Sequence, residues 1–176
     1  MKVLAIDPGY GRLGWAVGEV ENRQLKVIDF DCLETNPKTK QGERYQEIQT
    51  RLGEILSQHQ PQVLALEKLY FARNTTTALK VSEARGLVIA TCLPTINQII
   101  EFAPSEIKST VAGHGSADKN ALKKMTLLQL KIDPNAAEIA NSKTKLLDDA
   151  VDALAILLTF SSSHSVLLNQ SNHAIL

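Results

Sequence analysis

Residues 2–32 read KVLAIDPGYGRLGWAVGEVENRQLKVIDFDC and contain three candidate strands joined by short connections. Residues 2–7 are almost all apolar, which is typical of a central strand covered on both faces. Residues 15–21 alternate loosely between apolar and polar. In residues 27–32 the alternation is strict, which indicates a half-buried strand. Because the connections are short, the sequence predicts an antiparallel meander.

After the meander, segments with helical and strand patterns alternate along the chain. Helices are expected at residues 41–59, 74–93, 104–113, 116–130 and 145–160, and strands at residues 62–67 and 99–103. This order predicts an α/β fold with a mixed five-stranded sheet, three antiparallel strands followed by two parallel additions, and helices on both faces. Residues 1–160 are expected to form a single domain, and the Ser-, Asn- and His-rich residues 161–176 a flexible C-terminal tail.

Composition and charge are those of an ordinary globular protein. Of the 176 residues, 44% are hydrophobic and 22% charged, and the formal net charge is zero. Overall charge therefore does not indicate a nucleic-acid or membrane partner, although the middle of the chain is basic and its ends are acidic. No signal peptide and no apolar run of about 18 residues is visible, so we expect a cytoplasmic protein with no membrane partner. The two cysteines form no C-x-x-C motif, which argues against a zinc ribbon.

Four carboxylates stand at the edges of apolar runs. Asp7 follows VLAI, Glu67 follows VLAL, and Asp149 and Asp152 lie within LLDDAVDALAILL. Burying an acid costs free energy unless a cation meets it. Carboxylate oxygens suit Mg²⁺, with Mn²⁺ as a substitute. We therefore expect the four acids to hold metal, and two ions roughly 4 Å apart would suit phosphodiester cleavage.

The pair Asp149 and Asp152 has a simpler interpretation when it is taken alone. The two acids are three residues apart and share one face of the last expected helix, which could be a solvated face. That interpretation weakens once Asp7 and Glu67 can meet the pair from adjacent strand ends. Asp148 points away from Asp152 and is expected only to favour the helix start.

Residues 9–14, GYGRLG, match the dinucleotide-binding pattern G-x-G-x-x-G. That turn must open a helix, but Gly14, Gly18 and the stretch WAVGEVE favour a strand. Asp7 would also repel a pyrophosphate. We reject the dinucleotide interpretation and expect the turn at Pro8 to leave Asp7 exposed to a cleft.

Basic and aromatic residues accompany the acids. Lys119 lies in a helix that Ser116 is expected to cap, where exposed amides and Lys108 could complete an anion site for a phosphate. Lys123 belongs to the same basic block; the simpler interpretation of these lysines is a solvated surface. Tyr70 and Phe71, next to Arg73, could stack on an unpaired base, or could belong to the core. The candidate DNA-binding residues are therefore Lys108, Lys119, Tyr70, Phe71, Arg73 and Lys123.

Four blocks of the sequence together resemble the RuvC family of Holliday-junction resolvases, a branch of the ribonuclease H-like superfamily. The blocks are AIDPG, LEKLYFARNTTTALKVSEARG, IKSTVAGHGSADK and DDAVDALAI, and the resemblance spans residues 3–160. It implies a ribonuclease H-like fold and a Mg²⁺-dependent, structure-selective DNA endonuclease acting in recombination and repair. It also implies a homodimer that binds a four-way junction and nicks two opposed strands symmetrically, working with a branch-migration helicase complex.

The resemblance also implies residue roles. Asp7, Glu67, Asp149 and Asp152 match the metal-binding acids of the family. Lys108 and Lys119 match basic residues near the scissile phosphate, and Tyr70 matches an aromatic position that disturbs base pairing at the junction. Pro94 falls where relatives continue a helix, and the C-terminal tail lacks a basic cluster.

A non-cleaving junction-binding scaffold would keep the fold without turnover, but the four acids give no support to it. An RNA-processing nuclease of the same superfamily would use the same acids. An actin-like ATPase needs a second lobe and a further phosphate loop, for which the chain is too short.

Overall fold

The computed structural model describes residues 1–21, 24–69, 75–133 and 148–171. One five-stranded sheet, in the order β3-β2-β1-β4-β5, forms its centre. The strands β1, β2 and β3 pair antiparallel, whereas β4 pairs parallel to β1, and β5 parallel to β4. The predicted mixed sheet is therefore confirmed. Its strands are β1 (Lys2–Asp7), β2 (Arg12–Glu21), β3 (Gln24–Glu34), β4 (Val63–Glu67) and β5 (Gln98–Phe102).

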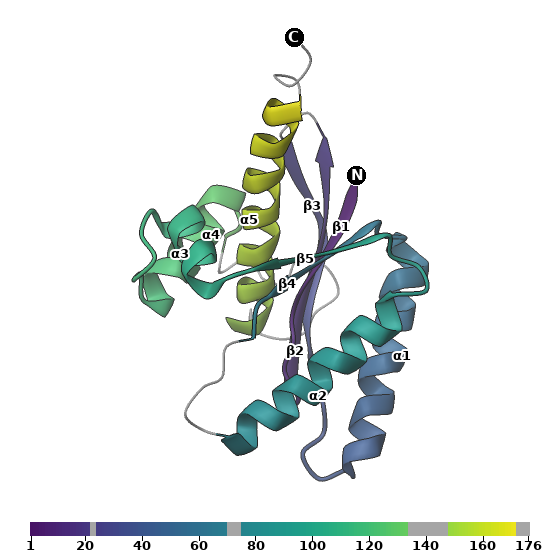
Figure 1. The fold of residues 1–176 in the computed structure, drawn as a ribbon. Coiled ribbons are helices and arrows are strands. Elements are labelled where there is room, and N and C mark those ends of the chain that lie inside the picture. The colour runs from purple at the N-terminus through teal and green to yellow at the C-terminus, as the bar shows by residue number, and fades with distance from the viewer. Residues whose placement is uncertain (22–23, 70–74, 134–147, 172–176) are drawn as a thin grey trace.

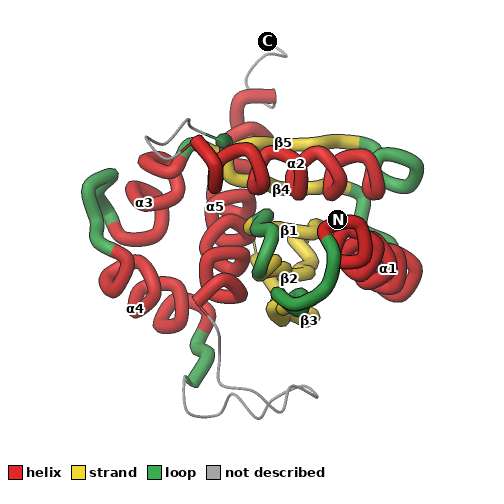
Figure 2. Tube along the Cα trace, turned by 90° about the horizontal axis from the view of Figure 1, so that it is seen from below, coloured by secondary structure: helices red, strands yellow, loops and turns green. Residues whose placement is uncertain are grey.

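Helices cover both faces of the sheet, as predicted (Figures 1 and 2). One face carries two helices, α1 (Gln41–His59) and α2 (Thr75–Cys92). On the other side, α5 (Asp148–Ser171) covers the sheet, and α3 (Pro104–Ala112) and α4 (Lys119–Leu130) pack against α5. None of the helices in the described part of the chain is long and apolar enough to cross a bilayer.

The central strand β1 serves two hydrophobic cores because successive side chains of a strand point to opposite faces. Leu4 and Ile6 are fully buried in the core beneath α1 and α2. Val3 and Ala5 are fully buried in the core beneath α5. This placement explains why residues 2–7 are apolar almost without interruption, and it fixes the end of β1 at Asp7, between the two layers of helices.

One predicted helix start and one predicted helix end are wrong. Ser116 does not cap α4; Asp118 does, and its Oδ1 accepts a hydrogen bond of 2.8 Å from the N–H of Ala121. Serine and aspartate are about equally good caps, so the sequence alone did not separate them. The last helix does not end at Phe160 but continues to Ser171.

The extension of α5 has a local explanation. Ser162 Oγ donates a hydrogen bond of 3.0 Å to the carbonyl of Leu158, one turn earlier in the helix. A serine hydroxyl bonded in this way satisfies itself within the helix and does not need to break it. Residues 161–171 are thus helical where a frayed segment was predicted, and residues 172–176 lie outside the described residues.

Candidate active site

The four predicted acids come from three elements that meet at one edge of the sheet. Asp7 and Glu67 are the last residues of β1 and β4, which are parallel neighbours and therefore end at the same edge. Asp149 and Asp152 lie in the first turns of α5, which packs across β1 and β2. Strand ends and a helix start thus bring together residues that are far apart in the sequence.

Gly14 allows α5 to approach this edge closely. It lies opposite Asp7 in the pairing of β1 with β2. A Cβ atom added to Gly14 would lie 1.8 Å from the carbonyl oxygen of Asp149 and 3.0 Å from the nitrogen of Ala150. The backbone of α5 therefore rests directly on Gly14, and this contact sets Asp149 beside Asp7. Sequence reasoning noticed Gly14 only as a poor helix former and missed this role.

Asp7 shows that the acids influence one another electrostatically. Burial raises the pKa of its carboxyl group, and the charges of Asp152, Glu67 and Asp149 raise it further, to about 7. The charge of Lys119 acts in the opposite direction. A carboxyl group whose pKa is higher in the folded than in the unfolded state stabilises the fold when it is protonated and destabilises it when it is ionised. As the pH rises from the ordinary pKa near 3.8 through about 7, ionisation of Asp7 therefore reduces the stability of the metal-free fold.

The pKa values of two further acids are raised in the same way. Burial and then the charge of Asp152 raise the pKa of Glu67, against the charge of Lys108. Burial also raises the pKa of Asp152, against the charge and hydrogen bond of Lys119. Since burial is the largest cause in each case, these carboxyl groups lie where charge is poorly solvated and where a cation would be stabilising.

Lys119, the first residue of α4, is turned toward the acids. Its Nζ lies 3.2 Å from Oδ2 of Asp152 and 3.9 Å from Oδ2 of Asp148. Burial lowers the pKa of Lys119, but these acids raise it more, so the net shift is upward. Asp118 caps this helix and accepts a hydrogen bond from the N–H of Ala121, which is one of the amides that the predicted anion site would use. Lys119 is instead the cation nearest Asp152 among the ion pairs of the described residues.

A cavity of about 240 Å³ joins the predicted lysines to the predicted acids. It is lined by Glu67, Lys108, Lys119 and Asp152 together with Pro104, Ile107, Leu122 and Ile156. Two acids and two lysines thus face the same space, with apolar side chains forming its walls. A phosphate that entered this cavity would meet both lysines at once, which suits recognition of a phosphodiester.

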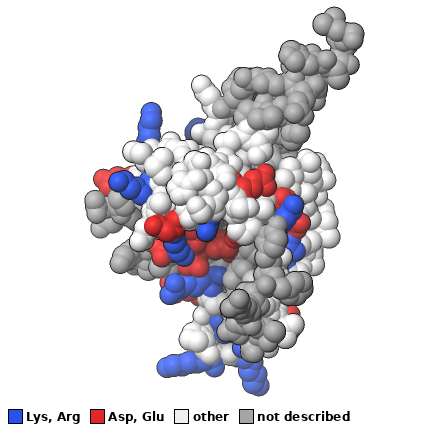
Figure 3. All heavy atoms as spheres, turned by 60° about the vertical axis from the view of Figure 1, so that its left-hand side comes forward, with Lys and Arg blue, Asp and Glu red and all other residues white. Residues whose placement is uncertain are grey.

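The remaining predicted DNA-binding residues do not line the cavity that contains Lys108 and Lys119, or lie outside the described residues. Lys123 Nζ lies 2.7 Å from Oδ1 of Asp148, so its charge is balanced within the protein. Tyr70, Phe71 and Arg73 lie outside the described residues. On the face that α3 and α4 present, acidic and basic side chains lie next to one another and not in separate patches (Figure 3).

The acids are neighbours but do not form a ready-made metal cage. In the described ranges, no group of three or more His, Cys, Asp or Glu side chains is placed to hold one ion. Two of the acids face protein cations instead, since Asp152 pairs with Lys119 and Asp149 lies 3.6 Å from Nη1 of Arg12. The donor chemistry nevertheless fits Mg²⁺ or Mn²⁺, which prefer carboxylate oxygens, and a divalent cation would offset the cost of ionising Asp7.

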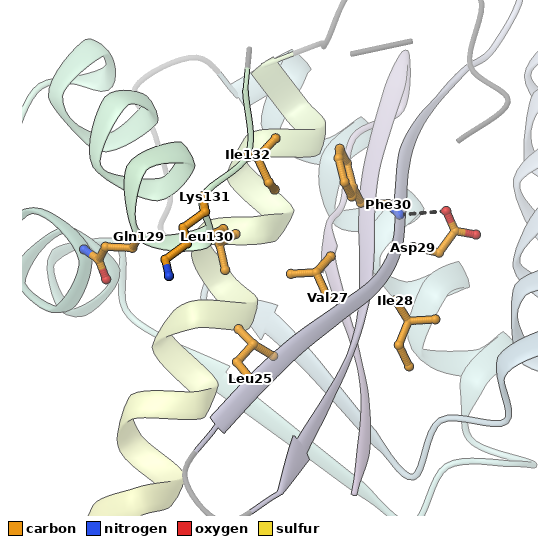
Figure 4. Close-up of a pocket in the computed structure, with 9 residues that line it drawn as sticks. All are labelled: Leu25, Val27, Ile28, Asp29, Phe30, Gln129, Leu130, Lys131 and Ile132. Atoms are coloured by element: carbon orange, nitrogen blue, oxygen red, sulfur yellow. Dashed lines mark hydrogen bonds between the residues drawn. The ribbon is translucent and has the colours of Figure 1, made fainter. Parts of the chain in front are cut away.

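A second cavity, of about 490 Å³, lies away from these acids, between β3 and the end of α4 (Figure 4). Leu25, Val27 and Phe30 of β3 face Leu130 and Ile132 across it. Its only described carboxylate, Asp29, accepts a hydrogen bond of 2.9 Å from the N–H of Phe30. The cavity contains none of the predicted site residues and is chiefly an opening at the edge of the hydrophobic core.

Comparisons with known proteins agree on one family. The family model described as "Crossover junction endodeoxyribonuclease RuvC" matches residues 3–160. The chain is 37% identical over 175 residues to a protein of that name from Caldicellulosiruptor saccharolyticus, covering 98% of this chain and 99% of the relative. It is 38% identical over 156 residues to one from Petrotoga mobilis, covering 88% of this chain and 90% of the relative.

Solved structures give the same result. A Thermus thermophilus RuvC structure is 29% identical, has a TM-score of 0.72, and is aligned over 90% of this chain and 92% of its own. Another T. thermophilus RuvC structure, in complex with a Holliday junction substrate, is 26% identical with a TM-score of 0.73 and the same coverage. A yeast mitochondrial Holliday junction resolvase shares the fold at 13% identity, with a TM-score of 0.69 and coverage of 97% and 83%.

Proposed function

The chain belongs to the RuvC family of crossover junction endodeoxyribonucleases, and from this membership we propose how its residues cut DNA. It is a structure-selective endonuclease that resolves Holliday junctions in DNA recombination and repair. The proposal assigns the reaction to the edge of the sheet where β1, β4 and α5 meet.

Asp7, Glu67, Asp149 and Asp152 are proposed as the catalytic, metal-binding acids. Mg²⁺, with Mn²⁺ as a substitute and two ions per site, would supply Lewis acidity that activates a water and stabilises the leaving oxygen. The acids supply the negative charge that holds such ions. Because Asp7 and Glu67 end rigid strands, their carboxylates are held in position before substrate arrives, which favours catalysis.

Lys108 and Lys119 are proposed to bind the oxygens of the scissile phosphate. Both line the cavity that also contains Glu67 and Asp152, and this shared cavity is the observation that carries the proposal. Lys119 would exchange part of its contact with Asp152 for the phosphate. Lys123, Tyr70, Phe71 and Arg73 are proposed as further DNA contacts, with the aromatic pair stacking on unpaired bases.

Two active sites are needed for paired symmetric nicks, and one chain supplies one set of four acids. We therefore propose a homodimer in which each chain cuts one of two opposed strands. We also propose that the dimer acts in the cytoplasm and works with a branch-migration helicase complex.

Comparing three substrates tests the proposed function. With Mg²⁺, the protein is expected to cut a synthetic four-way junction at least about 100-fold faster than the matched linear duplex or an RNA–DNA hybrid. Faster cutting of the hybrid would assign the acids to an RNA nuclease. Tight junction binding without cutting, in Mg²⁺ or Mn²⁺, would make the chain a junction-binding scaffold.

A further inference from the structure

We propose that Arg12 and Lys80 form a subsite for the phosphate that flanks the scissile one, and that Arg12 leaves Asp149 to bind it. This inference rests on the proposed function, because it assumes that a DNA strand crosses the four acids. It assigns a role to residues 9–12 that neither the sequence motifs nor the proposed chemistry had used.

A third cavity, of about 360 Å³, lies beside Asp149. Its other lining residues are Gly9, Tyr10 and Gly11 of the turn between β1 and β2, Arg12 at the start of β2, and Lys80 and Val81 of α2. The cavity with Lys108 and Lys119 contains Glu67 and Asp152, whereas this one contains Asp149. The acid cluster is therefore flanked by two cavities, each with two cations, as expected for a strand that carries successive phosphates past the acids.

Arg12 is held loosely enough to change partners. Its side chain is 53% exposed and lies between two acids, with Nε 3.5 Å from Oε2 of Glu34 and Nη1 3.6 Å from Oδ2 of Asp149. Both distances exceed the roughly 2.7–2.9 Å of a strong charge-assisted hydrogen bond. A phosphate offers a guanidinium two oxygens in bidentate geometry, which neither carboxylate provides here.

Tyr10, which lines this cavity, is held firmly in place, in contrast to Arg12. The buried Arg44 donates from Nε to Oγ1 of Thr35 at 2.8 Å and from Nη2 to the carbonyl of Tyr10 at 3.2 Å. Its guanidinium also lies 3.8 Å from the centre of the Tyr10 ring. Thr35 Oγ1 donates to the same carbonyl at 3.0 Å. Tyr10 is thus fixed as a wall from which exposed cations can reach a ligand.

Lys80 approaches the same ring from the cavity side. Its Nζ lies 5.3 Å from the centre of Tyr10, and the residue is exposed. Arg12 is brought near by the tight turn, because a Cβ on Gly9 would lie 2.0 Å from the carbonyl oxygen of Arg12. Arg12 at the start of β2 and Lys80 on α2 therefore face a single space large enough for a phosphate and its sugar.

If Arg12 exchanges Asp149 for a phosphate, its removal should change metal binding and DNA binding in opposite directions. While no metal is bound, Arg12 partly neutralises Asp149, so it competes with a divalent cation for that carboxylate. Once a divalent cation takes Asp149, Arg12 is released toward the flanking phosphate. Removing the charge of Arg12 should therefore strengthen metal binding and weaken DNA binding, whereas a merely structural Arg12 would weaken both or neither.

The experiment compares Arg12→Gln, Lys80→Gln and, as control, Lys26→Gln. Lys26 is an exposed lysine of β3. It lies opposite Glu19 in the register of β2 and β3, at the end of the sheet away from Asp7. Junction affinity is measured by fluorescence anisotropy in Ca²⁺ across a range of salt concentrations. Arg12→Gln and Lys80→Gln should each weaken binding about tenfold and reduce the log–log salt slope by about one, and Lys26→Gln should change neither.

The second readout is a Mn²⁺ titration of the DNA-free proteins, followed by thermal unfolding. Arg12→Gln should lower the Mn²⁺ midpoint about two- to fivefold, and Lys80→Gln should leave it unchanged. An Arg12→Gln protein with wild-type junction affinity and salt slope, or with an unchanged or raised Mn²⁺ midpoint, overturns the inference. Cleavage by the wild-type protein distinguishes failure of the proposed function from failure of this inference. A wild-type protein that does not cut junctions contradicts the proposed function itself.

Discussion

A Glu67→Gln protein is expected to lose at least about 1000-fold of its junction-cleavage rate while binding the junction within about twofold of wild type. The substitution keeps the shape of the side chain but removes its negative charge and one of its ligand oxygens. Folding should not suffer, because burial and the charge of Asp152 already raise the pKa of Glu67 and disfavour its charged form. Single-turnover cleavage and anisotropy on the same four-way junction measure both quantities.

Glu47→Gln is the matched control for this substitution. Glu47 is an exposed glutamate of α1, on the opposite side of the sheet from α5, and it should keep wild-type cleavage. If Glu67→Gln cuts at more than about a tenth of the wild-type rate, Glu67 is not one of the acids on which the reaction depends.

Gly14→Ala should reduce both stability and cleavage, although residue 14 touches no substrate. The new Cβ would lie 1.8 Å from the carbonyl oxygen of Asp149, so the start of α5 must move away from β2. Overpacking of this kind costs about 1–3 kcal/mol of unfolding free energy. A displacement of about 1 Å between Asp149 and Asp7 is expected to reduce the cleavage rate about 100-fold or more.

Gly53→Ala provides the opposite control. Gly53 lies inside α1, and a Cβ there meets nothing within 4 Å. Alanine is the better helix former, so this variant should gain about 0.5–1 kcal/mol and keep wild-type cleavage. Thermal unfolding and cleavage of both variants provide the comparison. Wild-type stability and rate in Gly14→Ala would show that the close approach of α5 to β2 does not position Asp149.

Local patterns predicted most of the fold. The helix at residues 41–59 was predicted with the bounds it has as α1, because Ile48, Leu52 and Ile55 repeat at helical spacing and are buried. The buried character of residues 2–7 likewise placed β1 in the centre of the sheet, and short connections predicted its antiparallel neighbours. These features depend on residues that are close together in the sequence.

Features that depend on distant backbone approach could not be predicted in this way. The role of Gly14 exists only because α5, more than a hundred positions later in the chain, rests on it. The turn GYGRLG was noticed for its glycines, but Arg12 within it was not, because its partners Glu34 and Asp149 come from separate elements. The available signal was an arginine that starts the strand after the turn following Asp7, a candidate acid.

The acids were predicted correctly as neighbours at one edge of the sheet because parallel strands end together and α5 begins there. Their pairing with cations was not predicted. Asp152 with Lys119 and Asp149 with Arg12 are tertiary contacts. Such pairs form because a half-buried carboxylate without a partner is costly, so it pairs with a cation that the fold places nearby.

Diffraction from crystals of this protein soaked in Mn²⁺ tests the assignment of the four acids most directly, because the anomalous signal locates the metal without assumptions about the reaction. We expect one or two Mn²⁺ peaks bound by carboxylate oxygens of Asp7, Glu67, Asp149 and Asp152, at about 2.0–2.2 Å. Arg12 and Lys119 should have moved away from Asp149 and Asp152. Saturating Mn²⁺ that leaves no peak among these acids, in crystals of protein that cuts junctions, would contradict the proposed site.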